Sequence, residues 1–353
     1  MRFREPIREA HSRERTTRCD RVELLVARYP RLRLALPRVA LLGAETPVER
    51  CLVGGATLLV KRDDLTSPTL GGNKVRSLEL LLATASPDRR LLTVGPRGST
   101  HALAVALHGA RLGRETEVLT WPQEMHDVAV HTSRRLKALA RVTEARSPSD
   151  AYLRAALRRV RGHFQWIPAG GSSPLGVLGH AGAALELVAQ LARDGVRMPE
   201  AVVVPLGSGG TVAGLLLGFA IAGMTTRVIG VRVVPRIVGN RGHVLRLAHG
   251  SHALLGRLAG EAVPRIDHSR LVIEHASYGG AYGRATAAAT GAAELFGQAG
   301  GPRLDGTYSA KAFGHALALA QRAPSGAVLF WLTFDARWLD AVDDTLRGLR
   351  PPR

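Results

Sequence analysis

The sequence predicts a two-domain α/β protein in which each domain has a mainly parallel sheet flanked by helices. Its 353 residues can bury a sizeable core. Short aliphatic runs alternate with helix-length segments along most of the chain, and several of the turns between them are rich in glycine and serine. Because a helix that follows a strand usually carries the chain back into the same sheet as a crossover, this alternation favours parallel strands.

The N-terminal part combines a polar extension with the first strand and helix of the core. Residues 1–38 are basic, and RVELLVARY is their only apolar stripe, so we expect an arm that packs on the body. The turn-like ETPVER then precedes ATLLVKR, an aliphatic run typical of a strand. Helical spacing begins in VRSLELLLATA, just after a pair of glycines that permits unusual backbone angles.

The rest of the chain alternates predicted strands with predicted helices. The strands are short buried runs, namely LLTVG, TEVLTW, ARVTEA, HFQWIP, AVVV, TRVIGVRVVP and AVLFWLTF. The helices between them are amphipathic or rich in alanine. The histidine-dotted segment 235–270 is predicted to be mostly helical, and because its spacing matches no zinc signature we expect no metal site.

We expect the larger domain to combine residues 39–76 with residues 186–353, and the smaller domain to hold residues 77–185. A ligand would then bind between the two domains.

The formal charge of +19 raises the possibility of a nucleic-acid-binding protein. However, the arginines are scattered over the whole chain, and aromatic residues are only 5% of it, which is poor material for base stacking. A nucleic-acid binder would show salt-sensitive binding. We interpret the charge as an arginine-rich solvated surface and expect no nucleic-acid partner.

Cysteine usage and hydropathy predict a cytoplasmic protein without a membrane segment. Cys19 and Cys51 are the only cysteines, too few for a disulfide framework. No apolar run reaches the ~20 residues of a membrane span, and the arginine-studded start lacks the hydrophobic centre of a secretory signal.

Lys74 stands out because only four of the 48 basic residues are lysines. Where a positive charge suffices the chain uses arginine, so a retained lysine can indicate a task that guanidinium cannot perform, such as Schiff-base formation. Among the other lysines, Lys61 lies beside two aspartates and is interpreted as a structural ion-pair partner. Lys137 has the position of an ordinary helix-surface residue, and Lys311 would anchor a turn or cap a helix.

A glycine-rich turn follows the strand AVVV and opens a helix, so its amides can converge on an anion. It consists of Gly207, Ser208, Gly209, Gly210 and Thr211. The turn lacks the lysine of a P-loop and the full dinucleotide fingerprint, which disfavours a nucleoside triphosphate or NAD. Taken alone, the motif is equally compatible with a tight turn that only needs small residues.

A second small-residue turn carries Ser99, which also suits a helix N-cap, and His101, which we expect to pack rather than act as a base. The phosphate-binding turn, the isolated Lys74 and this polar turn together match the needs of pyridoxal phosphate. That cofactor needs an anion nest, a lysine for its aldehyde and a polar partner for its ring nitrogen.

These motifs resemble the pyridoxal-phosphate enzymes of the tryptophan synthase β-like fold, known as fold type II. The similarity is greatest to the branch of 1-aminocyclopropane-1-carboxylate deaminase and D-cysteine desulfhydrase, and it runs from about Leu36 to Asp335. The segments that carry it are KRDDLTSPTLGGNKVRSLE, TVGPRGSTHALAVA, GGSSPLGVLGHAGAALEL, VVVPLGSGGTVAGL, the SYG at 277–279 and LDGTYSAKA.

The resemblance implies a cofactor held in the cleft between the domains. Lys74 would bind the aldehyde as a Schiff base and later move protons at the substrate α-carbon, and Asn73 would help to orient it. The turn from Gly207 to Thr211 would hold the phosphate.

The resemblance also assigns catalytic and ring-binding positions. Ser99 would meet the substrate carboxylate and act in catalysis, while Tyr278 and Tyr308 would approach the substrate. The remaining cofactor-binding positions are Thr100, Ser309 and Thr333, of which Thr100 replaces an asparagine beside the ring hydroxyl and the other two would face the ring nitrogen.

These residues predict α,β-elimination or deamination of a small amino acid, giving ammonia and a 2-keto acid. The hydroxyl of Ser309 cannot protonate the cofactor ring as a carboxylate can, which favours β-elimination over cyclopropane opening. The changes at Thr100, at 96–98 and at 332–335 leave an alternative open, a relative that binds cofactor or amino acid with different or no turnover. We further expect a homodimer.

Overall fold

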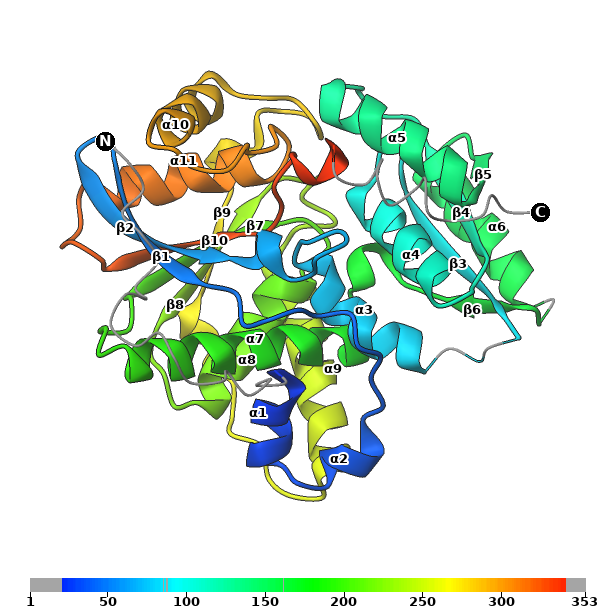
Figure 1. Ribbon diagram of the computed structural model, residues 1–353, viewed down its shortest axis with the longest axis horizontal. Helices are drawn as coiled ribbons and strands as arrows, with labels where there is room; N and C mark the ends of the chain where they lie inside the picture. The colour runs from blue at the N-terminus through cyan, green and yellow to red at the C-terminus, as the bar shows by residue number, and fades with distance from the viewer. Residues whose placement is uncertain (1–20, 85, 87, 161, 341–353) are drawn as a thin grey trace.

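The computed structural model describes residues 21–340 except 85, 87 and 161, and it contains two sheets side by side (Figure 1). The larger sheet has six strands in the order β1-β2-β10-β7-β8-β9, and the smaller has four in the order β5-β4-β3-β6. Nine of these strands pair in parallel with at least one neighbour, and helices cover both faces of each sheet. The predicted fold class is confirmed.

The large sheet is parallel except at one edge. Its strands are β1 (Val48–Val53), β2 (Ala56–Arg62), β7 (Ala201–Leu206), β8 (Arg227–Arg232), β9 (Leu271–Glu274) and β10 (Val328–Leu332). β1 pairs antiparallel with β2 through a turn at Gly54 and Gly55, both at positive φ. The sequence reading missed β1, because its alternation of exposed and buried residues places charges such as Glu49 where a turn was expected.

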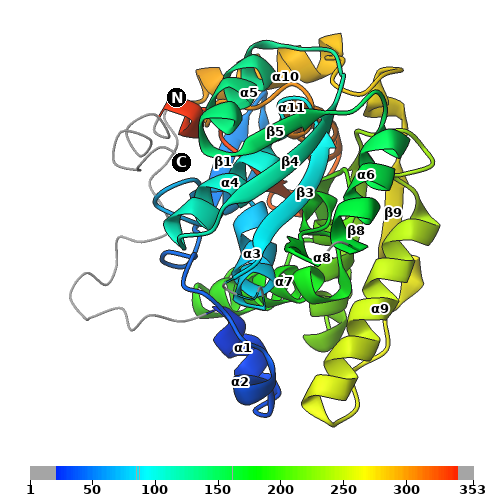
Figure 2. The ribbon, with the colours of Figure 1, turned by 90° about the vertical axis from the view of Figure 1, so that its right-hand side faces the viewer.

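The small sheet is entirely parallel. Its strands are β3 (Arg90–Pro96), β4 (Thr116–Trp121), β5 (Arg141–Glu144) and β6 (Phe164–Trp166). Figure 2 shows α4 (Thr100–Arg111) and α5 (Asp127–Leu139) on one face and α6 (Pro148–Val160) on the other.

The helices of the large sheet form two layers with separate cores. One layer contains α7 (Pro174–Arg193), α8 (Gly210–Ile221) and α9 (Arg241–Ala259), and the other contains α10 (Ala287–Gln298) and α11 (Ser309–Ala320). The second core centres on the rings of Phe296, Phe313 and Phe330, which meet in tilted and edge-to-face contacts.

The N-terminal arm packs on the first layer. Its helices are α1 (Arg21–Arg28) and α2 (Leu32–Ala35), and the side chains of Leu25, Tyr29 and Leu32 are fully buried in the same core as α7. The expected packing of RVELLVARY is therefore seen, while residues 1–20 of the extension lie outside the described residues.

The position of helix α7 corrects the predicted domain boundary. The boundary predicted between residues 185 and 186 falls inside this helix, which packs on α8, α9 and α3 (Lys74–Ala83). We therefore propose a domain boundary just before Pro174.

In the described part of the chain, α7 alone is long and apolar enough to cross a membrane, and most of it is buried, as in a core helix.

The carboxyl ends of several strands from both sheets face one crevice. β7 leads into the turn at Gly207, β10 into Thr333, and β3 into the turn at Ser99. Ligands of open parallel sheets bind at this kind of edge.

Candidate active site

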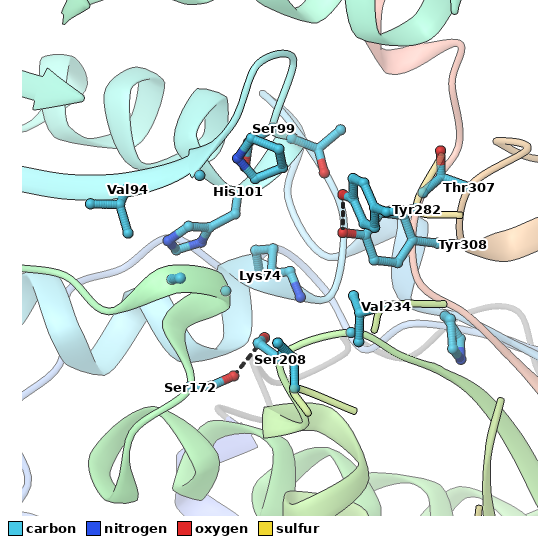
Figure 3. A pocket seen from close by; sticks show the side chains of 18 of the residues that line it. Lys74, Val94, Ser99, His101, Ser172, Ser208, Val234, Tyr282, Thr307 and Tyr308 are labelled. Atoms are coloured by element: carbon cyan, nitrogen blue, oxygen red, sulfur yellow. Dashed lines mark hydrogen bonds between the residues drawn. The ribbon is translucent and has the colours of Figure 1, made fainter. Parts of the chain in front are cut away.

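A cavity of about 720 Å³ opens between the two sheets, and residues of both domains line it. Figure 3 shows Lys74 near its centre, with Ser208 and Ser172 on one side and Ser99, Tyr282 and Tyr308 on the other. Volumes of about 300–1,000 Å³ are typical of small-molecule sites.

Asn73 fixes the start of the helix that carries Lys74. Its backbone N–H donates to the carbonyl of Thr333 at 2.9 Å, and its side-chain Nδ2 donates to Oγ1 of Thr211 at 2.8 Å. The asparagine therefore does not cap its own helix α3. It joins that helix to the end of β10 and to the glycine-rich turn, which supports the predicted orienting role.

Lys74 has an unusual electrostatic environment. Its amine reaches the cavity, yet the surrounding protein excludes enough water to lower its pKa from 10.5 to about 8. Within the described part of the chain, no salt bridge involves this lysine. A pKa near 8 leaves a useful fraction of free amine near neutral pH, as a nucleophilic or basic lysine requires.

The glycine-rich turn presents bare backbone at the positive end of α8. Gly209 has φ +87°, and a Cβ at Gly207 would lie 3.0 Å from the ring of Tyr308. Ser172 accepts from the Gly210 amide at 3.1 Å and donates to Oγ of Ser208 at 2.7 Å. This arrangement fits a phosphate, because amides and hydroxyls converge where the helix dipole is positive.

Two tyrosines form a hydroxyl pair in the cavity. The hydroxyl oxygens of Tyr282 and Tyr308 lie 2.5 Å apart, and their rings meet at 82° (Figure 3). Asp305 accepts from the backbone N–H of Thr307, Tyr308 and Ser309 and so fixes this turn. Burial raises the pKa of Tyr308 to about 12 and that of Tyr282 well above 10, so both are proton donors at neutral pH.

The structure brings Tyr282, and not Tyr278, to the cavity. Tyr278 is absent from the cavity lining, its ring lies under the guanidinium of Arg232 at 4.2 Å, and its carbonyl accepts from Lys311 Nζ at 2.6 Å. Sequence reasoning missed Tyr282. The signal was present, because the dipeptide Tyr-Gly occurs at 278–279 and again at 282–283. The substrate role predicted for Tyr278 has no support in this geometry.

The small-domain turn places Ser99, Thr100 and His101 in the cavity wall. Ser99 also caps α4, because its Oγ accepts from the amide of Ala102 at 3.2 Å. Burial, with a smaller effect of the Lys74 charge, lowers the pKa of His101 to about 3. A neutral histidine that contacts Thr93 at 3.2 Å is consistent with the predicted packing role.

Thr333 and Ser309 were expected near the cofactor ring nitrogen. Thr333 lines the cavity, whereas Ser309 lies just behind the lining, next to Tyr308. The hydroxyl oxygen of Ser309 is buried and has no hydrogen-bond partner among the described residues. Because this oxygen is closed off from the cavity, the contact predicted between Ser309 and the ring nitrogen has no support in this geometry, whereas Thr333 lines the cavity.

The residues present thus fit the cofactor that the sequence resemblance implies. An anion nest, a desolvated lysine and the hydroxyl of Thr333 line the same cavity.

Comparison with known proteins agrees with this cofactor. Residues 39–333 match the family described as pyridoxal-phosphate dependent enzyme. The chain is 38% identical to nocardicin C-9' epimerase of Nocardia uniformis subsp. tsuyamanensis, over 86% of this chain and 94% of the relative. It is 32% identical to D-cysteine desulfhydrase of Salmonella choleraesuis, over 78% and 86%. A crystal structure of an ACC deaminase homologue superposes with a TM-score of 0.73 at 27% identity, covering 92% of this chain and 99% of that one.

Proposed function

The chain belongs to the pyridoxal-phosphate-dependent enzyme family, and from this premise we propose that it catalyses α,β-elimination or deamination of an amino acid, releasing ammonia and a 2-keto acid. The observation that carries the proposal is Lys74, a desolvated amine without a salt bridge in the described residues, in a cavity with an anion nest and protonated hydroxyls. The 32% identical desulfhydrase and the structural similarity to an ACC deaminase homologue support this reaction class. When bound, the cofactor draws electrons from the substrate's α-carbon and so makes its C–H bond acidic.

In this proposal Lys74 would bind the aldehyde of the cofactor and would act as the base at the substrate α-carbon. A pKa of about 8 suits both tasks, since the amine can exchange a proton near neutral pH. The backbone of Gly207–Thr211 would bind the phosphate of the cofactor.

Ser99 would bind the substrate carboxylate, because its hydroxyl projects from the N-terminus of α4, where a negative charge is stabilised. Tyr308, hydrogen-bonded to Tyr282, would donate a proton to the leaving group. The hydroxyl of Thr333, which lines the cavity, would meet the ring nitrogen without protonating it, which favours elimination over cyclopropane opening.

An absorbance spectrum tests the proposal first. We expect the purified protein to bind added pyridoxal phosphate as a yellow species, and borohydride reduction followed by peptide mapping to locate the label at Lys74. A panel of D- and L-amino acids, including D-cysteine, should then yield a keto acid with the wild type and not with Lys74→Ala. A protein that takes up no cofactor, or that labels elsewhere, contradicts the proposal. Cofactor binding without turnover would favour a relative that binds but does not react.

A second candidate is epimerisation of the α-carbon, which the 38% identity to an epimerase favours. Lys74 would remove the proton from one side, and Ser99, on a different wall of the cavity, would return one from the other (Figure 3). Incubation in deuterated water distinguishes the two. Epimerisation gives the inverted amino acid with deuterium at the α-carbon, whereas elimination gives ammonia and a keto acid.

A further inference from the structure

We propose that the outer part of the cavity is a subsite for an aromatic side chain of the amino-acid substrate. The subsite is formed by Trp121, Tyr152 and Trp166, here called the aromatic wall, all of which line the same cavity as Lys74. The inference rests on the proposed function and deepens it by naming the substrate class. The relatives support the small amino acid that the sequence predicted, and the aromatic wall would add an aromatic group to the side chain of such a substrate.

The two tryptophans flank β3 at register positions four residues apart, because Trp121 pairs with Pro96 and Trp166 pairs with Leu92. Trp121 is the last residue of β4 and Trp166 the last residue of β6, with β3 between these strands. Tyr152 projects from α6, which packs across β3, β4 and β6. Its ring lies 6.3 Å from each tryptophan, at interplanar angles of 33° to Trp121 and 63° to Trp166. The three rings therefore form one aromatic surface along β3 between Leu92 and Pro96.

This surface adjoins the place where the substrate's carboxylate is expected. β3 ends at Pro96, the register partner of Trp121, and the amide of Arg97 donates to the Trp121 carbonyl at 2.8 Å. Ser99 follows two residues later and lines the cavity. A substrate whose carboxylate meets Ser99 and whose α-carbon meets Lys74 can extend its side chain along the aromatic wall.

Apolar side chains are exposed to solvent at the mouth of the cavity. The side chain of Tyr152 is 46% exposed, and on the large-domain side Val238, which lines the same cavity, is 42% exposed. Val234 and Pro235 continue that apolar side. Contiguous apolar surface at a site mouth marks a binding region, because covering it removes it from water.

The aromatic wall favours a substrate side chain that is flat and apolar. Aromatic rings pair edge to face or offset at centroid distances of about 4.5–7 Å, and the spacing within the wall already has this geometry. The guanidinium of Arg159 lies over the ring of Trp166 at 5.6 Å and stabilises its position. A cavity of about 720 Å³ also exceeds what a small side chain would fill beside the cofactor.

A pair of substrates that differ only in the group on sulfur tests the proposal. With the holoenzyme, β-elimination breaks the α-carbon C–H bond and the Cβ–S bond, water supplies the keto oxygen, and the products are pyruvate, ammonium and a thiol. S-phenylcysteine and S-methylcysteine, each as both enantiomers, therefore share one readout, pyruvate. The thiols differ as leaving groups, so the informative quantity is the change in the ratio of their kcat/KM values between wild type and variant.

We expect Tyr152→Ala and Trp166→Ala each to lower the ratio of phenyl to methyl kcat/KM by about tenfold, since each removes an aromatic contact and its buried area. Tyr152→Phe keeps the ring and should retain the wild-type ratio. Leu153→Ala is the matched control, because Leu153 is exposed on the same helix and does not line the cavity. Equal losses for both substrates in the alanine variants, or a ratio that does not move, would overturn the subsite.

Failure of the subsite can be told apart from failure of the proposed reaction. If neither substrate yields pyruvate, calorimetric titration of the holoenzyme with phenylglycine and with alanine replaces kinetics. Tighter binding of phenylglycine that Tyr152→Ala weakens by about tenfold supports the subsite even though elimination is then wrong. Equal affinity for the two amino acids contradicts the subsite under either reaction.

Discussion

Two lysines in one short segment are both enclosed by protein, but their surroundings differ. Lys61, at the end of β2, donates to Oε1 of Glu186 at 2.6 Å and to the carbonyl of Thr46 at 2.7 Å. Lys74 has no such carboxylate in the described residues. Burial lowers the pKa of both amines, and Glu186 opposes this effect only at Lys61. Lys61 is thereby held within an ion pair, which supports a structural role, whereas Lys74 lines the cavity.

The Lys61 site is part of a larger buried ionic cluster. Arg76 contacts Oδ1 of Asp63 at 2.5 Å and Oε2 of Glu186 at 3.1 Å, and Nε1 of Trp331 donates to Asp63 at 2.8 Å. The cluster joins β2, α3, α7 and β10. The predicted structural role of Lys61 is thus supported, with Glu186 as its ion-pair partner. Arg76 lies two residues after Lys74 in α3. The ionic cluster therefore also fixes the first turn of the helix that carries Lys74.

Replacing Lys74 by alanine should give the largest effect on activity. Loss of a general base alone costs about 10²–10⁴-fold in rate, and covalent attachment of the cofactor is lost as well. Keto-acid release should become undetectable. Stability should change little, since no salt bridge of the described residues is broken. Urea unfolding of the apoprotein checks this, and a large loss of stability would contradict the contrast with Lys61.

Replacing Lys61 by alanine should mainly destabilise the protein. Removing one partner of a buried ion pair costs about 3–5 kcal/mol of unfolding free energy, because Glu186 keeps its charge without that cation. Lys137→Ala is the control, since that lysine is exposed on α5 and should shift stability by less than about 0.5 kcal/mol. The midpoint of urea unfolding measures both. Similar midpoints for the two variants would show that the buried cluster contributes little.

The two candidate tyrosines provide a finer test of the reactive region. Tyr308→Phe removes a hydroxyl from the cavity and should lower kcat by about 10²-fold. Tyr278→Phe retains the ring under Arg232 and should keep kcat within about twofold, because Tyr278 does not line the cavity. Steady-state kinetics on one substrate compares them. A larger loss in Tyr278→Phe would restore the original assignment.

The smallest expected effect is the pH dependence of cofactor capture. Only the neutral amine of Lys74 can attack the aldehyde, so capture by the apoprotein should accelerate as the pH rises through about 8. Stopped-flow absorbance measures the rate, and Nα-acetyl-lysine in solution corrects for titration of the cofactor itself. A midpoint at the ordinary 10.5 would show that the amine is not desolvated. The lowered pKa of Lys74 also affects stability. Between pH 8 and 10.5 this lysine is protonated in the unfolded chain but not in the folded one, so its contribution to the free energy of unfolding increases as the pH rises.

Local patterns in the sequence determined the fold class and the central elements of the site. Alternating strands and helices predicted the parallel sheets, and the composition singled out Lys74. The glycine-rich turn at 207–211 was recognisable because a strand, bare backbone and a helix start are consecutive in the chain. Each of these signals depends on residues close together in sequence.

Only the tertiary structure decided what depends on residues that are distant in the chain. The choice of Tyr282 over Tyr278 depends on which one contacts Tyr308, the partner of Lys61 is Glu186, and the aromatic wall joins three separate elements. No periodicity encodes these contacts, because burial and proximity across crossovers arise only when the sheets assemble. The sequence therefore singled out Lys74 as the proposed reactive lysine, while packing determined its environment and the side chains that line the cavity.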